Sequence, residues 1–152
     1  MSNIIEVKNL FKSFGDVKAV CDLSFHVKEG ELFAFLGVNG AGKSTTINII
    51  CGQMHPDSGN VVVNGYNFDR NPDEIKSSLG VVFQNSLLDS SLSVYDNLAS
   101  RAALYGIHGD SFRKRLQELE TILHYEDLIK RTVGKLSGGQ RRRIDIARAL
   151  IH

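Results

Sequence analysis

Residues 37–44 read GVNGAGKS and match the pattern GxxxxGK followed by Ser or Thr at every fixed position. Just before them, residues 32–36 form an apolar run, which predicts a strand buried on both faces. Just after them, residues 43–51 predict a helix, and Gly52 is a suitable end for it. Strand, glycine-rich loop and helix in this order predict a phosphate-binding loop in an α/β fold. The plainer interpretation, a glycine-rich turn before an ordinary helix, leaves the complete match unexplained.

Each residue type in this loop has a chemical role to offer. Glycines let the backbone approach a phosphate without a Cβ clash, and successive N–H groups then form an anion site at the helix N-terminus. Lys43 can reach the β- and γ-phosphates, Ser44 can ligate Mg²⁺, and Thr45 can contact the α-phosphate. We therefore expect ATP and Mg²⁺ to bind here. The expected cofactor-binding residues of the loop are Gly37, Asn39, Gly40, Ala41, Gly42, Lys43, Ser44 and Thr45.

The rest of the front half predicts mainly β structure. Apolar and polar residues alternate with period two at 5–8 and 23–27, which predicts half-buried strands. Residues 61–63 followed by Asn64 and Gly65 predict a hairpin, and residues 79–83 predict another short apolar strand. In the helix at 43–51, the residues expected to be buried are Ile47, Ile50 and Cys51.

From about residue 91 the pattern becomes helical. Ser93 is the expected N-cap of one helix, and Ser111 is the expected cap of another, whose apolar residues fall at 112, 116, 119 and 123. Ser137 and Gln140 have the spacing of a capping box at the start of a last helix. The apolar face of that last helix is expected to contain Ile144, Ala147, Leu150 and Ile151.

The amino-acid composition excludes several classes of protein and of binding partner. The chain has 152 residues and a net charge of +1, so there is no global electrostatic case for nucleic acid as a partner. Two cysteines make no disulfide framework, which favours a reducing compartment, and the five histidines have no zinc-ligand spacing. The basic run at 141–143 predicts a solvated helix face. No secretory signal or stretch of 18 apolar residues occurs, so we expect no direct membrane insertion.

The run LSGGQ at 136–140 contains more than a helix cap needs. Two consecutive glycines raise the cost of ordering the first turn, whereas bare backbone at a helix N-terminus suits a closely approaching phosphate. Together with the loop at 37–44, this motif resembles the nucleotide-binding domain of ABC transporters over essentially the whole chain. The resemblance implies a P-loop NTPase core with an N-terminal antiparallel β subdomain and a helical subdomain. It also implies three parts, namely 1–85, 86–133 and 134–152.

The resemblance assigns roles to two further residues. Phe14 matches the aromatic residue that stacks on adenine, and Gln84 matches the glutamine that contacts Mg²⁺ and the attacking water. On the residues alone, such a Phe is more often part of a core and such a Gln is usually a surface residue. Lys43 and Gln84 are thus the expected catalytic residues, and Ser44 and Gln84 the expected metal ligands.

In the ABC family two nucleotide-binding domains dimerise head to tail. The resemblance therefore implies that the signature residues act in trans, on the ATP held by the partner's loop; they are Ser137, Gly138, Gly139 and Gln140. It also implies contact with an integral membrane permease and a peripheral position on the cytoplasmic face of the membrane. The stretches 81–89 and 104–107 most resemble the drug- and polysaccharide-export type.

Family members continue beyond the signature helix with an apolar strand that ends in Asp-Glu, and the 152 residues contain no match to it. Without that metal-binding Asp and catalytic Glu, we expect weak nucleotide binding and negligible turnover of this chain alone. We also expect the strand at 32–36 to have an unpaired edge, and the isolated chain to be marginally stable. The simplest interpretation is a fragment or a truncated product.

Two other classes share the first motif. A P-loop kinase would lack LSGGQ and the helical segment before it. A soluble ABC-type ATPase of translation or DNA repair usually pairs two such domains or carries a coiled-coil insert, and residues 86–133 are too few for a long coiled coil.

Overall fold

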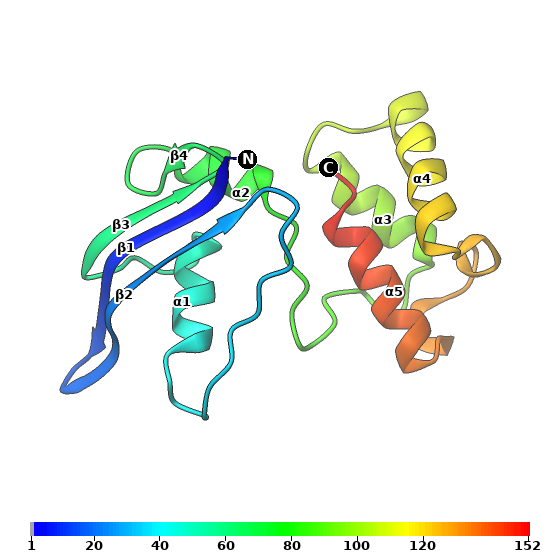
Figure 1. Ribbon diagram of the computed structural model, residues 1–152. Coiled ribbons are helices and arrows are strands. Elements are labelled where there is room, and N and C mark those ends of the chain that lie inside the picture. The colour runs from blue at the N-terminus through cyan, green and yellow to red at the C-terminus, as the bar shows by residue number, and fades with distance from the viewer. Residues whose placement is uncertain (1) are drawn as a thin grey trace. The chain divides into compact units, whose positions relative to one another are not determined.

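The computed structural model describes residues 2–152, and the chain divides into two compact units, Met1–Leu79 and Gly80–His152. The first unit contains a β sheet and two helices, and the second is helical (Figure 1). The structure therefore combines an antiparallel sheet with helices, in agreement with the expected α/β class.

The sheet of the first unit has the strand order β2-β1-β3-β4, and every neighbouring pair is antiparallel. β1 spans Asn3–Phe14, β2 spans Val17–Lys28, β3 spans Ser58–Val63 and β4 spans Tyr66–Asn67. The strands predicted at 5–8 and 23–27 lie within β1 and β2 and are confirmed. The side chains that alternate toward one face form the core with the helices.

The hairpin predicted at Asn64 and Gly65 is confirmed. Both residues have positive φ, 50° and 80°, and they connect β3 to β4. This is the backbone twist that a two-residue hairpin turn requires, because it matches the right-handed twist of the strands on either side.

Helix α1 spans Lys43–Ile50 and follows the glycine-rich loop as predicted (Figure 1). Its buried residues are Thr46, Ile49 and Ile50, whereas Ile47, which we expected to be buried, is 44% exposed. Positions 46, 49 and 50 share one helix face, and Ile47 lies outside it. The core around α1 also contains Val7, Leu10, Val20, Val61, Val63, Phe68 and Ile75.

Helix α2 spans Pro72–Ser78 and was not anticipated from the sequence. Proline stands in its first turn, and Asp73 and Glu74 follow, which suits the positive end of a helix dipole. Its one buried residue, Ile75, joins the core of the first unit. With a single apolar anchor in seven residues, the helical period is too short to be recognised in the sequence.

The strands predicted at 32–36 and 79–83 are wrong, because neither segment forms a strand in the structure. Leu32 is 98% exposed and Leu36 is 90% exposed, although Phe33 stacks on Phe25 of β2 and Phe35 meets the same ring edge to face, at ring-centroid distances of 5.2 and 5.0 Å. A strand buried on both faces needs hydrogen-bonding neighbours, and within residues 2–152 no strand pairs with either segment.

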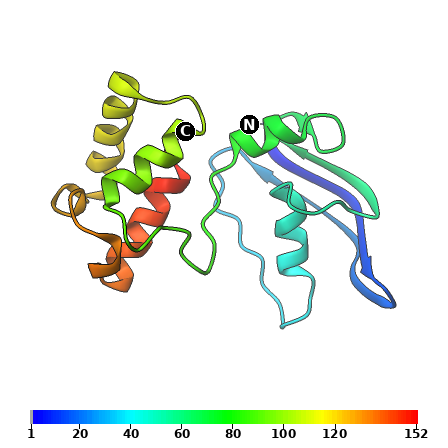
Figure 2. The same cartoon turned by 180° about the vertical axis from the view of Figure 1, so that it is seen from behind.

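The second unit packs three helices together, α3 over Val94–Ala103, α4 over Gly109–Leu123 and α5 over Gly138–Ala149 (Figures 1 and 2). Two 3₁₀ turns, η1 (Glu126–Leu128) and η2 (Val133–Lys135), connect α4 to α5. The shared core contains Val94, Leu98, Ala102, Phe112, Leu116, Leu119, Tyr125, Leu128, Val133, Leu136, Ile144, Ala147 and Ile151.

Two of the three predicted helix caps are confirmed. The Ser93 hydroxyl accepts from the Asp96 N–H at 3.1 Å, and Ser137 forms a complete capping box with Gln140. The cap predicted at Ser111 is wrong, because α4 begins at Gly109 with His108 as N-cap. Ser111 therefore lies in the first turn, where its hydroxyl donates to the His108 carbonyl at 2.7 Å. Of the expected last apolar face, Leu150 is 41% exposed, and the other three residues are buried.

Candidate functional site

The loop before α1 depends on glycine for its shape. Gly37, Gly40 and Gly42 have φ values of 154°, 88° and 75°, which side chains disfavour. At Gly42 a Cβ atom would also run into the carbonyl oxygen of Ala19 on β2. Gly42 is the N-cap of α1 and offers no side chain to the first helical N–H groups, which therefore stay available to an anion.

The Lys43 side chain folds back over this loop. Its ammonium group donates to the carbonyl oxygens of Gly37 at 2.6 Å and Val38 at 2.7 Å. An ammonium group has three donors, so one remains for a phosphate oxygen in this geometry. The first turn of α1 is further held by Thr46, whose hydroxyl donates to the Gly42 carbonyl at 3.0 Å. The two hydrogen bonds to Gly37 and Val38 hold the Lys43 ammonium against the backbone of the glycine-rich loop.

A pocket of about 190 Å³ lies at this loop. Its lining comprises Ala19, Asn39, Gly40, Gly42, Lys43, Ser44 and Thr45, so the structure brings together six of the eight residues expected there. The other two, Gly37 and Ala41, belong to the same loop, and Ala41 donates from its N–H to the Val38 carbonyl at 3.2 Å. The lining residues carry backbone amides, an ammonium group and two hydroxyl groups, a set that suits a phosphate chain with a bound divalent cation.

Phe14 lies at the end of β1 and is 48% exposed. It does not line the phosphate pocket, although Ala19, which does, lies on β2 beyond the hairpin turn. The Lys12 ammonium lies 5.7 Å from the centre of the Phe14 ring and pairs with Asp57 at 2.7 Å. The half-exposed ring offers aromatic surface of the kind that stacks on a base, and a cation lies over it.

Asp57 supports the strand end that carries Phe14, and the sequence analysis gave it no role in the site. Its carboxylate accepts from the Lys12 ammonium and from the Ser13 N–H, both at 2.7 Å. These two hydrogen bonds, with that from Lys12 the larger effect, lower the pKa of Asp57 from its ordinary value. Asp57 and Ser13 are 44 residues apart in the sequence, so the hydrogen bond between them leaves no local sequence pattern.

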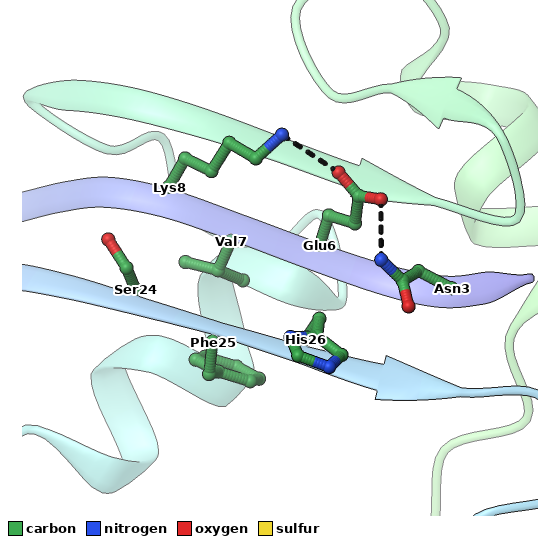
Figure 3. A pocket seen from close by; sticks show the side chains of 7 residues that line it. All are labelled: Asn3, Glu6, Val7, Lys8, Ser24, Phe25 and His26. Carbon is green, nitrogen blue, oxygen red and sulfur yellow. Dashed lines mark hydrogen bonds and ion pairs between the residues drawn. The ribbon is translucent and has the colours of Figure 1, made fainter.

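A larger pocket, of about 290 Å³, lies on the sheet and contains none of the predicted site residues. Figure 3 shows Glu6 between Asn3, at 2.8 Å, and Lys8, at 3.1 Å, with His26 and Ser24 on the neighbouring strand. The hydrogen bond from Asn3, followed by the interactions with Lys8, lowers the pKa of Glu6. The carboxylate is therefore already paired at an exposed surface, which is the behaviour of a solvated sheet face.

The signature residues lie together at the N-terminus of α5. The Ser137 N–H donates to the Gln140 side chain at 3.0 Å, and the Gln140 N–H donates to the Ser137 hydroxyl at 3.3 Å. Gly138 and Gly139 have no positive φ, and a Cβ atom built on either would meet nothing within 4 Å. Neither the backbone nor the packing of the described residues therefore requires glycine here, which leaves a bare helix end facing outward.

Gln84 lies in the second unit, exposed, in a segment without helix or strand. Ser44 belongs to the first unit, so the pairing of Ser44 with Gln84 around Mg²⁺ stays a prediction. Within residues 2–152, no three His, Cys, Asp or Glu side chains gather in a group that could hold a metal ion. A divalent cation here would depend on hydroxyl and amide oxygens and on the phosphates themselves.

Comparison with known proteins agrees with this geometry. A family model described as ABC transporter matches residues 20–152. The chain belongs to the ABC transporter family. The bacitracin transport ATP-binding protein of Bacillus licheniformis is 38% identical over 152 residues, which are 100% of this chain and 49% of that protein. The linearmycin resistance ATP-binding protein of Bacillus subtilis strain 168 is 39% identical, over 98% of this chain and 48% of that protein. The ABC chain thus spans about half the length of these relatives.

Solved structures place this ABC chain in the same fold. A Clostridium perfringens protein, part of the ABC transporter complex cbiONQ, superposes with a TM-score of 0.89 at 30% identity, covering 99% of this chain and 62% of that one. An ATP-binding cassette of an ABC transporter in its ADP conformation gives 0.87 at 27% identity, covering 99% and 65%. The expected ABC fold class is therefore confirmed.

The basic run of this ABC domain is exposed at Arg142 and Arg143, as expected of a solvated helix face, and both side chains also make hydrogen bonds to distant carbonyl groups. Arg142 donates to the Phe83 carbonyl, and Arg143 donates to the His124 carbonyl at 2.5 Å. Sequence analysis missed both roles, because a carbonyl acceptor 59 residues away has no sequence pattern of its own. No helix among the described residues combines the length and the apolar character needed to cross a membrane.

Proposed function

We propose that this chain is the ATP-Mg-binding part of an ABC transporter, in which ATP binding and hydrolysis drive transport through a membrane permease. The observation that carries the proposal is the loop at 37–44. Its glycines, the Lys43 ammonium and the hydroxyl groups of Ser44 and Thr45 surround one pocket at the N-terminus of α1. That arrangement fits a triphosphate better than any other class of ligand.

In this proposal each residue has a defined task. Lys43 holds the β- and γ-phosphates, the loop N–H groups hold the phosphate chain, and Phe14 stacks on the adenine. Ser44 and Gln84 are the protein ligands for Mg²⁺, and Gln84 also orients the attacking water. When bound, Mg²⁺ would supply positive charge to neutralise the charge that develops on the phosphate oxygens.

The bare N-terminus of α5 supports a second nucleotide contact. Gly138 and Gly139 are not explained by the packing of this chain, and Ser137 already satisfies its own helix cap. We assign Ser137, Gly138, Gly139 and Gln140 to the γ-phosphate of ATP held by a second copy, in a head-to-tail dimer. The helical segment 86–133 would present that signature, and a permease would keep the dimer at the inner face of the membrane.

The relatives suggest a class of cargo. One is named for bacitracin transport and the other for linearmycin resistance. We propose that this chain serves an exporter of the same type, with an antibiotic-like compound as cargo.

Hydrolysis by these 152 residues alone should be slow. Phosphoryl transfer to water needs the metal held from the far side and a group that positions the water. Within the described residues, Ser44 and Gln84 are the candidates for the metal, and no group of three His, Cys, Asp or Glu side chains could hold it. We therefore propose ATP-Mg binding with negligible turnover for this length of chain.

The proposal is tested by comparing Lys43→Ala with Lys8→Ala. Calorimetric titration with ATP-Mg should show affinity reduced at least about tenfold in Lys43→Ala, because a charge-assisted contact to phosphate is lost. Lys8→Ala removes an equal charge from the exposed face of β1 and should bind as the wild type does. Equal affinities of Lys43→Ala and wild type would refute a phosphate site at this loop.

A further inference from the structure

Residues 80–87, which include Gln84, have no helix or strand, yet they are attached to α5 at three points. A Cβ atom at Gly80 would collide with the Ala149 carbonyl, so the backbone passes directly against the helix there. The Arg142 guanidinium donates to the Phe83 carbonyl, next to Gln84. The Ser86 hydroxyl donates to the Asp145 carboxylate at 2.9 Å.

The three helix positions involved, 142, 145 and 149, lie on one face of α5. Asp145 is only 9% exposed, and Arg148 on the same helix attracts its negative charge. Arg142 makes a charge-assisted hydrogen bond, one of the stronger polar contacts available to a segment that lacks secondary structure. Gln84 is thus bracketed by Arg142 on one side and Asp145 on the other.

Helix α5 begins with the signature turn. A helix of 12 residues with a complete capping box behaves as a rigid rod over this distance. Arg142 is four residues after Gly138, the first residue of the helix. Any displacement of the Phe83 carbonyl is therefore transmitted through the Arg142 hydrogen bond to the start of α5. A mobile loop would carry Gln84 without moving the signature, whereas this attached segment cannot.

We propose that Arg142 and Asp145 are positioning residues that hold Gln84 in register with the signature turn, so that the two nucleotide contacts of one chain move together. This inference rests on the proposed function, in which Gln84 senses the chain's own ATP-Mg and the signature contacts the partner's ATP. Arg142 and Asp145 touch neither nucleotide. They connect the two sites of a dimer through each chain.

Arg142→Ala and Arg143→Ala make a matched pair for the test. Both remove one guanidinium from the same turn of α5, but Arg143 donates to His124, away from Gln84. In the nucleotide-free full chain, hydrogen–deuterium exchange of amides 81–88 should be about tenfold faster in Arg142→Ala and unchanged in Arg143→Ala. Equal exchange in the two variants, or no change in Arg142→Ala, would overturn the inference.

A second readout separates positioning from loss of structure. The Mg²⁺ concentration for half-maximal ATP binding should rise about tenfold in Arg142→Ala, while ATP affinity at saturating Mg²⁺ changes less than about twofold, since Lys43 is untouched. Arg142→Lys retains one donor and should restore part of the Mg²⁺ response. A uniform fall in ATP affinity without a Mg²⁺ effect would contradict positioning.

Asp145 is tested with Asp145→Asn and Asp145→Ala. The asparagine keeps an acceptor for Ser86 and should leave exchange of amides 81–88 nearly as in the wild type, whereas the alanine should accelerate it. Acceleration by both, or by neither, would contradict the role given to Asp145.

The proposed function fails separately, if Lys43→Ala leaves ATP binding intact while the exchange results hold.

Discussion

At the scale of single residues, the glycines of the phosphate loop are not equivalent. Gly40 and Gly42 both have positive φ, but a Cβ atom at Gly40 would meet nothing within 4 Å. At Gly42 it would collide with the Ala19 carbonyl, because the loop passes directly over β2 before α1 begins. One glycine is needed for its backbone angle alone, and the other for its angle and for space.

This difference predicts unequal costs of substitution. Gly40→Ala should lower the free energy of unfolding by about 1 kcal/mol, the strain of a left-handed alanine. Gly42→Ala should lower it by about 3 kcal/mol, since a clash with backbone is added to that strain. Urea denaturation of both variants measures the difference. Equal losses would show that the approach of Gly42 to Ala19 does not constrain the loop.

At the scale of elements, α5 combines a stabilising cap with a first turn that contains two destabilising glycines. The Ser137–Gln140 capping box satisfies the helix end, while Gly138 and Gly139 raise the entropy cost of ordering it. A Cβ atom at either position would meet nothing within 4 Å, so the packing of the described residues gives no reason for glycine here. A helix that gives up stability at one turn only is consistent with a contact made there to another molecule.

Alanine at these positions should therefore stabilise the fold and impair function. Gly138→Ala and Gly139→Ala should each raise the free energy of unfolding by about 0.5–1 kcal/mol, measured by urea denaturation. The same variants should lose ATP-dependent dimerisation in analytical ultracentrifugation, because each Cβ would lie where we propose that the partner's phosphate approaches.

Ala103→Gly, at an exposed position of α3, is the control for that experiment. It should lower stability by a similar amount and leave dimerisation unchanged. The assignment of the signature turn would be wrong if Gly139→Ala dimerised with ATP as well as the wild type does.

At the scale of the whole molecule, each of the two units has its own core. One core lies between the sheet and α1, and the other lies among α3, α4 and α5. Three apolar residues of the segment at 32–38 lie outside both cores, since Leu32, Leu36 and Val38 are 98%, 90% and 80% exposed. An apolar segment with unpaired backbone is a site for self-association.

For the 152-residue chain, Leu32→Ser with Leu36→Ser should reduce concentration-dependent aggregation, followed by light scattering during slow heating. The free energy of unfolding from urea denaturation should stay within about 0.5 kcal/mol of the wild type, because exposed positions contribute little to stability. Leu10→Ser, at a fully buried position, is the contrasting variant and should unfold the sheet unit. Unchanged aggregation in the double variant would show that another surface mediates the self-association.

The sequence by itself determined the features whose interactions are local. The glycine-rich loop before α1, the Asn64-Gly65 turn and the caps at Ser93 and Ser137 each depend on hydrogen bonds or backbone angles within a few residues, so their patterns were sufficient. The periodic apolar faces of α4 and α5 were predictable for the same reason.

Only the tertiary structure decided which distant groups meet. It showed that Gly42 must clear Ala19, that Asp57 holds Lys12 beside Phe14, and that Arg142 reaches the Phe83 carbonyl. It also left residues 32–36 without a strand partner, although their apolar run predicted a strand. A strand's hydrogen bonds and a long side chain's acceptor come from elsewhere in the chain, and local periodicity contains no record of that choice.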